Sequence, residues 1–477
     1  MKNPRLIPEP IPLELPDFFE DIRQLISDGH LLLNYFGSSE KLIYALLGKD
    51  QELKLLCAPF PTSGNYEALT PQYPAFNMYE RLLYEEHGVR PEGHPWLKSV
   101  RNHLPEEEKH EDYPFLESDS PLLHEVGVGP VHAGVIEPGH FRFICKGERV
   151  KHLEIQLGYQ HRGMEKLFLK GDIRHKSFLA ECIAGDTAIG HNLAYCLALE
   201  ALAESPGAAM TIRFIALEME RTAMHLADLS ALGTDIAYIM GQNLFAALRT
   251  TVINSSLAIC GSRFGKRWLT PGGVNYGINK TQAETLRNTL KDVRAQVINS
   301  AEAMFENSSV LSRFDDTGVL KSEDVIALGI SGMAAKASGI ASDARLEFPL
   351  PEQNSFDPFI INSGDVHARA FLRYREIIQS LDIVLALLFK LDFEAKTLHE
   401  LGDFRANSIA ISIVEGWRGR IVHMLKTDSE GEVLWYKILD PSFVNWQGLA
   451  LAMRETAISD FPICNKSFNL SYCGSDL

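Results

Sequence analysis

Three stretches of the chain repeat apolar residues at the spacing of an α-helix, and this pattern limits the possible folds more than any other feature of the sequence. Such an apolar stripe nearly always faces a protein core, so each stretch is expected to be a helix of a packed bundle. Joints rich in glycine and proline, such as residues 269–274, separate these helices. The stripes are Ala216, Met219, Ala223 and Leu226; Leu286, Leu290, Val293, Val297, Ala301 and Met304; and Ala370, Tyr374, Ile377 and Leu381.

Two of the expected helices also carry ionisable side chains at helical spacing. Ionised groups that are buried between helices must pair with one another, because an unpaired buried charge is costly. Ion pairing inside the bundle is therefore the favoured interpretation, and a path for protons or substrate is the alternative. The two sets are Glu218, Arg221 and His225, and Arg369, Arg373 and Glu376.

The N-terminal part of the chain has the pattern of a small α/β domain. A helix is expected to begin at Pro16, and residues 42–46 and 53–57 alternate like strands. A segment rich in acidic residues and proline then indicates a linker. The expected division of the 477 residues is a small α/β domain over 1–101, an acidic linker over 102–122, and a mainly α domain with small β elements over 123–477.

Charge and hydropathy restrict where the protein can act. The net charge of −16 argues against direct binding of nucleic acid and against docking on anionic lipid through a basic patch. The longest uninterrupted apolar run, Ile383 to Phe389, is far shorter than the about 20 residues that a membrane helix needs. The proline-rich N-terminus has no apolar signal core, so the chain is expected to be neither secreted nor membrane-spanning.

The seven cysteines are scattered, and no CxxC pair occurs. A disulfide framework is not expected, which indicates a reducing compartment. The sequence therefore lacks the cysteine motifs that usually mark tetrahedral zinc sites and cysteine-ligated iron–sulfur clusters. The sequence also lacks GxGxxG, GxxxxGK[ST] and GxSxG, so dinucleotide, nucleoside triphosphate and serine-esterase functions have no motif support.

A series of motifs in residues 123–477 resembles the large subunits of membrane-associated, energy-converting NiFe hydrogenases. A weaker version of the first motif occurs in the quinone-site (49-kDa-type) subunit of respiratory complex I. The resemblance implies a hydrogenase large-subunit-like helical domain. The motifs are Gly129–Phe143, Leu157–Lys166, Leu217–Arg221 with His225, Thr270–Gly273, Ala337–Gly339 with Asp343 and Arg345, Gly364–Ser380 and Glu415–Gly419.

The N-terminal part has a resemblance of its own. Glu80–Arg81, His87–Val89 and Gly93–Leu97 are similar to the end of the 30-kDa-type subunit of complex I. Formate hydrogenlyase-type hydrogenases fuse these two modules in the same order.

In NiFe hydrogenases, four thiolates from two CxxC motifs hold nickel, because soft anionic sulfur suits this metal. The first family motif, E-R-x-C-G-x-C-x-x-x-H, matches residues 181–191 with His191 in register. Ala184 and Thr187 stand at the two ligand positions, and Cys182 lies two residues too early.

The second family motif, D-P-C-x-x-C-x-x-R, matches residues 467–477. Ser471 and Gly474 stand at its ligand positions, and Cys473 is one residue off. Alanine and glycine have no donor atom, and neutral hydroxyls are poor nickel ligands, so no metal is expected at the four positions. We expect Cys182 and Cys473 to be inert thiols, with a redox pair as the alternative.

The resemblance also implies roles for polar residues around the former metal cavity. Glu137 matches the glutamate that passes protons to and from the hydrogenase site, and Arg418 matches the arginine above the metal. Burial raises the pKa of a carboxyl group and a nearby arginine lowers it. A carboxyl group under both effects is suited to proton transfer near neutral pH. The alternative is a relict salt bridge that fills the cavity.

In complex I the same cavity binds the quinone head group through a histidine on the first-motif loop and a tyrosine. This chain keeps His132 and His140 on that loop, while Cys182, a weak donor, stands at the tyrosine position. With His191, these residues are the candidates for binding a cofactor or a quinone.

The chain is thus expected to be a subunit of a complex I-like, hydrogenase-related oxidoreductase complex, acting only within that complex. It would lack a NiFe centre of its own and would couple electron transfer to ion movement, with a quinone or another small acceptor in the cavity. The implied partners are a small iron–sulfur subunit, which would hold the clusters, and membrane antiporter-like subunits, which would hold the chain on the inner face of the cell membrane. The alternative is a non-catalytic scaffold that transmits conformational change in an ion-transport complex.

Overall fold

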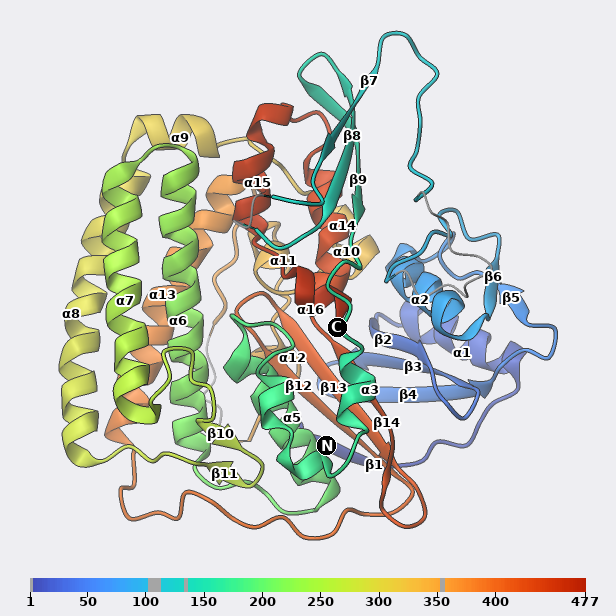
Figure 1. The fold of residues 1–477 in the computed structure, drawn as a ribbon, viewed down its shortest axis with the longest axis horizontal. Coiled ribbons are helices and arrows are strands. Elements are labelled where there is room, and N and C mark those ends of the chain that lie inside the picture. The colour runs from blue at the N-terminus through green and yellow to red at the C-terminus, as the bar shows by residue number, and fades with distance from the viewer. Residues whose placement is uncertain (1–2, 102–112, 133–135, 352–356) are drawn as a thin grey trace.

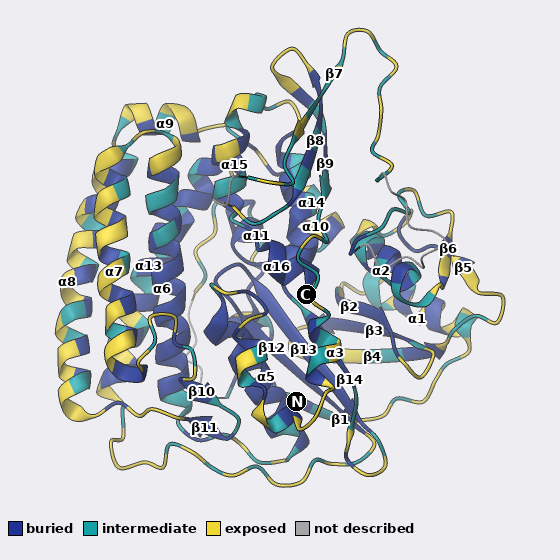
Figure 2. Cartoon of the chain, viewed as in Figure 1, coloured by how far each residue is buried: buried dark blue, intermediate teal, exposed yellow. Residues whose placement is uncertain are grey.

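Four long helices form a bundle along one side of the molecule (Figure 1). The computed structural model describes residues 3–101, 113–132, 136–351 and 357–477. All three apolar stripes expected from the sequence are buried in this bundle and confirm it as core, while the outward side of α8 is exposed (Figure 2). The bundle helices are α6 (Met210–Asp235), α7 (Ile239–Cys260), α8 (Lys280–Phe305) and α13 (Val366–Phe389).

A four-stranded antiparallel sheet, in the order β1-β12-β13-β14, lies beside the bundle at the centre of the molecule (Figure 1). Every residue of β12 and β13 is buried, because α5 (Ala188–Leu202) packs against these strands and residues of the N-terminal part pack there as well. The pair Glu415 and Arg420 ends the ladder between β12 and β13 and leaves residues 416–419 as the connecting turn. The strands are β1 (Arg5–Pro8), β12 (Ser408–Glu415), β13 (Arg420–Thr427) and β14 (Val433–Leu439).

The N-terminal part contains a second antiparallel sheet, in the order β2-β3-β4, with α1 and α2 (Figure 1). The helix expected at Pro16 and the strands expected at residues 42–46 and 53–57 are confirmed as α1, β3 and β4. The first strand, β1, pairs instead with β12 of the large domain. The elements are α1 (Leu15–Ser27), β2 (Leu31–Gly37), β3 (Leu42–Lys49), β4 (Glu52–Pro59), β5 (Asn65–Glu67), α2 (Asn77–His87) and β6 (Arg90–Glu92).

A three-stranded hairpin sheet and three short helices complete the surroundings of the site. Most of the expected linker, residues 102–112, lies outside the described residues. The sheet, in the order β7-β8-β9, projects from the body of the molecule (Figure 1). Its strands are β7 (His124–Val128), β8 (His140–Lys146) and β9 (Arg149–Gln156), and the helices are α14 (Ser442–Ala452), α15 (Phe461–Phe468) and α16 (Tyr472–Asp476).

Shorter elements connect these parts. None of the helices in the described part of the chain is both long and apolar enough to cross a membrane. The connecting elements are α3 (Met164–Phe168), α4 (Ser177–Ala180), β10 (Leu269–Thr270), β11 (Gly273–Val274), α9 (Ser308–Phe314), α10 (Ser322–Leu328), α11 (Gly332–Ala337) and α12 (Ala344–Glu347), with short 3₁₀ turns at Pro74–Phe76, Ile173–His175 and Ile458–Asp460.

Candidate functional site

Two segments about 290 residues apart in the chain meet at the candidate site, and Arg162 joins them. Its guanidinium donates hydrogen bonds to the carbonyl oxygens of Cys182 at 2.6 Å and Ile183 at 2.9 Å on the first segment. It also donates to the carbonyl oxygen of Cys473 at 3.0 Å on the second. Because charge-assisted bonds of this kind are among the strongest in proteins, one side chain fixes both segments. Arg162 lies within the Leu157–Lys166 motif, but no pattern in the sequence predicted a role for it.

Arg418 makes a second bridge between the same segments, from the turn between β12 and β13. Its guanidinium binds both carboxylate oxygens of Asp186 at 2.7 Å and donates to the carbonyl oxygen of Asn469 at 2.5 Å. It also stacks on the Trp417 ring, with its central carbon 3.9 Å from the ring centroid. Burial lowers the pKa of Arg418, but the Asp186 carboxylate outweighs burial, so the pKa lies above its usual value. The guanidinium is therefore a permanent cation at the site.

Four residues, here called the former ligand positions, align with the cysteine ligands of the hydrogenase motifs. The first pair offers one hydroxyl and no sulfur. The four are Ala184, Thr187, Ser471 and Gly474. Ala184 is fully buried and has no donor atom. The hydroxyl oxygen of Thr187 accepts hydrogen bonds from Trp417 at 3.1 Å and from Arg418 at 3.2 Å. Both positions therefore contribute to packing and to the placement of Arg418.

At the second pair of former ligand positions, Ser471 caps a helix and Gly474 faces a carboxylate. The Ser471 hydroxyl oxygen accepts the backbone N–H of Gly474 at 2.9 Å and so caps α16. A Cβ atom placed on Gly474 would lie 2.7 Å from both Cγ and Oδ2 of Asp440. The Asp440 carboxylate thus takes the space that a side chain at position 474 would need.

Glu137 lies half-buried on the loop before β8 and faces α16. Burial and the negative charge of Glu137 raise the pKa of the Cys473 thiol to about 11. The same two effects raise the pKa of the Tyr472 phenol to about 12. Within the described residues, Arg418 pairs with Asp186. Burial, together with the charge of Glu137, further favours the protonated form of the Cys473 thiol.

The two loop histidines brace their own loop. His132 Nε2 lies 2.9 Å from the carbonyl oxygen of Gly139, and His140 Nδ1 lies 3.1 Å from that of Gly129. A carbonyl oxygen only accepts, so these nitrogens carry the hydrogen. The His140 ring packs beside Phe115, at 4.9 Å between ring centroids. None of the contacts found for these histidines in the described part of the chain reaches Arg418 or a former ligand position.

His191 is fully buried and belongs to a chain of four polar side chains. Its Nε2 lies 3.0 Å from Asp440 Oδ2, and its Nδ1 lies 3.0 Å from His423 Nε2. His423 Nδ1 is in turn 2.6 Å from the Tyr436 hydroxyl. Motif register predicts His191 in the cavity, but no pattern in the sequence indicates its partners. Cys182, by contrast, is exposed.

The expected ion pairing inside the bundle is confirmed. Arg221 lies 3.1 Å from Glu218, and His225 lies 2.9 Å from Glu376. Lys336 on α11, which no sequence pattern indicated, lies 2.6 Å from Glu376. Its neighbours include the carboxylate of Asp343 at 2.8 Å and, on α12, Arg345.

A link joins this buried cluster to the site. The side-chain amide of Asn469 donates to Asp228 at 2.5 Å, and its carbonyl oxygen accepts from Arg418. Asp228 also pairs with Arg373 on α13 at 2.6 Å. A chain of charged and polar contacts therefore runs from the turn at Arg418 into the bundle.

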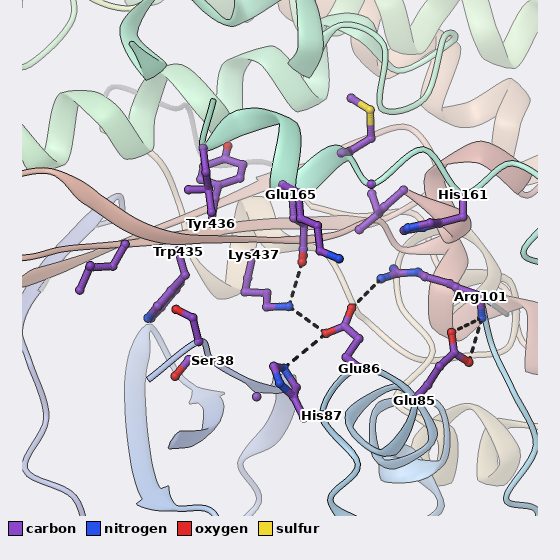
Figure 3. A pocket seen from close by; sticks show the side chains of 18 residues that line it. Ser38, Glu85, Glu86, His87, Arg101, His161, Glu165, Trp435, Tyr436 and Lys437 are labelled. Atoms are coloured by element: carbon purple, nitrogen blue, oxygen red, sulfur yellow. Dashed lines mark hydrogen bonds and ion pairs between the residues drawn. The ribbon is translucent and has the colours of Figure 1, made fainter. Parts of the chain in front are cut away.

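A separate pocket of about 320 Å³ lies between the N-terminal part and the large domain (Figure 3). Lys437 crosses it, with Nζ 2.8 Å from Glu165 and 3.1 Å from Glu86. Arg101 approaches Glu86 at 3.6 Å, and residues 434–437 of β14 form part of the wall. The charges in this pocket therefore satisfy one another.

No group of three or more His, Cys, Asp or Glu side chains within the described ranges is arranged to hold a metal ion. The donors at the candidate site are guanidinium, carboxylate, hydroxyl and imidazole groups already bound to one another. This set does not resemble the soft sulfur donors that nickel centres use.

Comparison with known proteins gives consistent matches. Residues 235–401 match the family described as the 49 Kd subunit of respiratory-chain NADH dehydrogenase. The carbon monoxide-induced hydrogenase of Rhodospirillum rubrum is 28% identical, over 72% of this chain and 97% of that protein. Hydrogenase-4 component G of Escherichia coli (strain K12) is 27% identical, over 87% of this chain and 76% of that protein.

Among solved structures, a chain from the membrane-bound sulfane sulfur reductase, an archaeal respiratory membrane complex, has the same fold. The TM-score is 0.69 at 22% identity, and the match covers 76% of this chain and 100% of that chain.

Proposed function

Because this chain belongs to the superfamily that unites hydrogenase large subunits with the 49-kDa subunit of respiratory-chain NADH dehydrogenase, we propose that it is the large subunit of a membrane-associated oxidoreductase complex without a NiFe centre of its own. Electrons would arrive from iron–sulfur clusters in a small partner subunit. Membrane antiporter-like partners would hold the chain on the inner face of the membrane and move ions.

The state of the four former ligand positions carries this proposal. Ala184 offers no donor, and the hydroxyls of Thr187 and Ser471 are already engaged by Trp417, Arg418 and the start of α16. At Gly474 the Asp440 carboxylate takes the place of a side chain. A NiFe centre does not fit these residues, so no step of the proposed reaction passes through one.

The remaining polar groups suit the reduction of a small acceptor such as a quinone. Arg418 is a fixed cation that would stabilise negative charge developing on the acceptor. Glu137 is half-buried beside α16 and would exchange a proton with the acceptor at its carboxylate. His132 and His140 hold the loop that carries Glu137, which makes them positioning residues in this proposal.

One observation favours the alternative of a conformational scaffold. The nitrogens of Arg418 are engaged by Asp186, Thr187 and Asn469, and Asn469 continues to Asp228 in the bundle. Such a chain of contacts would transmit a displacement at the turn without any chemistry at the site.

Reoxidation of the reduced complex separates the two functions. The purified complex is reduced, freed of excess reductant and mixed with menadione, and the loss of the reduced cluster signal is followed by electron paramagnetic resonance. Acceptor reduction predicts reoxidation that Glu137→Gln slows by about tenfold or more. Glu148→Gln, on the exposed turn between β8 and β9, is the matched control. Reoxidation that is unaffected by Glu137→Gln removes the role of Glu137, and no reoxidation at all supports the scaffold.

A further inference from the structure

Another cavity, of about 370 Å³ and here called the α14 pocket, lies between the N-terminal part and α14 and has no part in the function proposed above. It is bounded by α2, residues 96–100, β9 and α14, and α14 packs against β9 (Figure 1). A cavity of this volume is in the range of sites that bind small organic molecules. Its apolar lining includes Trp96, Leu157, Leu328, Phe443, Trp446 and Leu451.

The apolar lining of the α14 pocket has a buried part and an open part. Phe443 and Trp446 are each 3% exposed and belong to the core beneath the pocket. Trp96, Leu157 and Leu451 are only half-buried, so apolar surface of the pocket remains in contact with water. A flat apolar ligand that covered these three side chains would be bound favourably, because it removes this surface from water.

The charged side chains of the α14 pocket leave an excess of positive charge. The Glu154 carboxylate is matched by Lys98, whose Nζ lies 2.7 Å away. Arg81 donates to the carbonyl oxygens of Lys98 and Ser99 at 2.7 and 2.9 Å, and Arg454 is exposed on the wall. Among the described residues, neither arginine forms an ion pair with a carboxylate. The pocket therefore attracts an anion, although the whole chain carries a net charge of −16.

The positive charge of Arg454 acts on the interior of the pocket as well as at its edge. His152 also lines the pocket, and burial is the main reason that the pKa of this imidazole lies below its usual value. Arg454 and Lys98 lower the pKa further, whereas Glu154 raises it. His152 is therefore neutral near neutral pH and does not compete with Arg454 for an anion.

We propose that the α14 pocket binds a flat aromatic acid. The ring system would lie against Trp96, Leu157 and Leu451, and the carboxylate would pair with the Arg454 guanidinium. A guanidinium and a carboxylate can pair through two parallel hydrogen bonds, which fixes the orientation of the ligand. A neutral aromatic molecule would gain only the burial of its rings, and a small inorganic anion would gain only the contact with Arg454.

The α14 pocket adjoins the candidate site without belonging to it. Trp446 lines the pocket, donates from Nε1 to the carbonyl oxygen of Ser471 at 3.3 Å, and packs against Tyr472 at 4.8 Å between ring centroids. Ser475 of α16 lines the pocket as well. A ligand would therefore bind against residues that hold the second segment of the site. The proposal does not rest on the proposed function, since binding requires neither an acceptor nor a partner subunit.

Isothermal titration calorimetry of the full chain with 2-naphthoate tests the proposal. We expect one bound molecule per chain, and about tenfold weaker binding of 2-naphthalenemethanol, which has the same rings without the charge. Arg454→Gln is expected to weaken 2-naphthoate binding by about tenfold and to leave 2-naphthalenemethanol binding unchanged. The matched control is Arg405→Gln, which removes an exposed arginine that pairs with Glu204 outside the pocket and should change neither affinity.

A variant that fills the cavity tests the position of the ligand. Ala450 is half-buried and lines the pocket from α14, so the ring of Ala450→Phe would take up space that the ligand needs. This variant is expected to weaken the binding of both compounds by about tenfold or more. Absence of 2-naphthoate binding to the wild type overturns the proposal, as does binding that neither Arg454→Gln nor Ala450→Phe weakens. Equal weakening of both compounds by Arg454→Gln would exclude the carboxylate pairing and so the aromatic acid.

Discussion

The charged cluster inside the helix bundle and the candidate site are both rich in ionised side chains, but they differ in how those charges are held. In the bundle, Lys336 and Glu376 are at most 2% exposed and pair with each other through their side chains. At the site, Arg162 binds backbone carbonyls, and Arg418 pairs with Asp186, whose side chain is 40% exposed. The bundle charges therefore hold the fold together, whereas the site charges fix two loops and leave a carboxylate open to a partner or ligand.

The largest expected effect comes from breaking the bundle cluster. Lys336→Met removes the ammonium that lies 2.8 Å from Asp343 and 2.6 Å from Glu376, leaving buried carboxylates short of a cation. Loss of one partner of a buried pair costs about 3–5 kcal/mol. We expect a decrease of this size in the free energy of unfolding, measured by urea denaturation.

Lys291→Met on the exposed side of α8 is the control for that variant, with a change within about 0.5 kcal/mol. If Lys336→Met lowers the free energy of unfolding by less than about 1 kcal/mol, the buried carboxylates do not need the Lys336 ammonium as a partner, which contradicts the structure.

A smaller effect is expected from filling the space at position 474. In Gly474→Ala the new Cβ atom would meet Asp440 and the Ser471 hydroxyl, 2.7 and 2.9 Å away. Overpacking of this kind costs about 1–3 kcal/mol. Gly185→Ala in the first segment is the matched control, because its Cβ atom would have no neighbour within 4 Å. If thermal unfolding shows the two variants to be equally stable, Asp440 does not occupy the position.

Glu415 lies at the junction of the two regions, since it begins the turn that carries Arg418 while its carboxyl lies 3.9 Å from Lys336. Burial and the Asp343 carboxylate raise the pKa of Glu415. The protonated Glu415 carboxyl stabilises the fold fully below the pKa of about 4.3 that a glutamate has in the unfolded chain. This stabilisation is lost as the pH rises through the raised pKa of the folded protein. Compared with Glu415→Gln, the wild type should lose up to about 1.4 kcal/mol of unfolding free energy per pH unit in that range.

Urea titrations of both proteins at several pH values between 5 and 8 measure this difference. A wild type that gains stability over Glu415→Gln as the pH rises would reverse the sign and place an ionised Glu415 in the folded protein.

The smallest effect concerns the link between the regions. Asn469→Gly keeps the left-handed backbone conformation (φ 45°) and the carbonyl that Arg418 binds, but removes the amide that binds Asp228. Because Asp228 still pairs with Arg373, a loss of about 1 kcal/mol is expected. Calorimetry of this variant and of its double mutant with Arg418→Lys would show coupling if the two regions communicate, and additive losses if they do not.

Local patterns made the helical part of the fold predictable. The stripe from Leu286 to Met304 and the set Glu218, Arg221 and His225 repeat at helical spacing, so the sequence specified both the core face and the need for ion pairs. The strands Ser408–Glu415 and Arg420–Thr427 were not located. Every residue in them is buried, and the second strand lacks the alternation of polar and apolar residues that marks a half-buried strand.

The candidate site was predictable only in part. Motif register brought Arg418 and the four former ligand positions into one region, but Asp440 and His423 depend on contacts with His191 across more than 200 residues. No local pattern reports such contacts. Arg162 lay within a quoted motif, so its position was visible in the sequence although its bridging role was not.

The central claim is that the former metal position is closed by side chains that cannot bind nickel. Metal analysis by mass spectrometry of the intact complex, purified from its host grown with nickel, tests this claim directly. We predict nickel far below one atom per chain, with iron accounted for by clusters in the partner subunit. Near-stoichiometric nickel that remains with this chain after the subunits are separated would contradict the account.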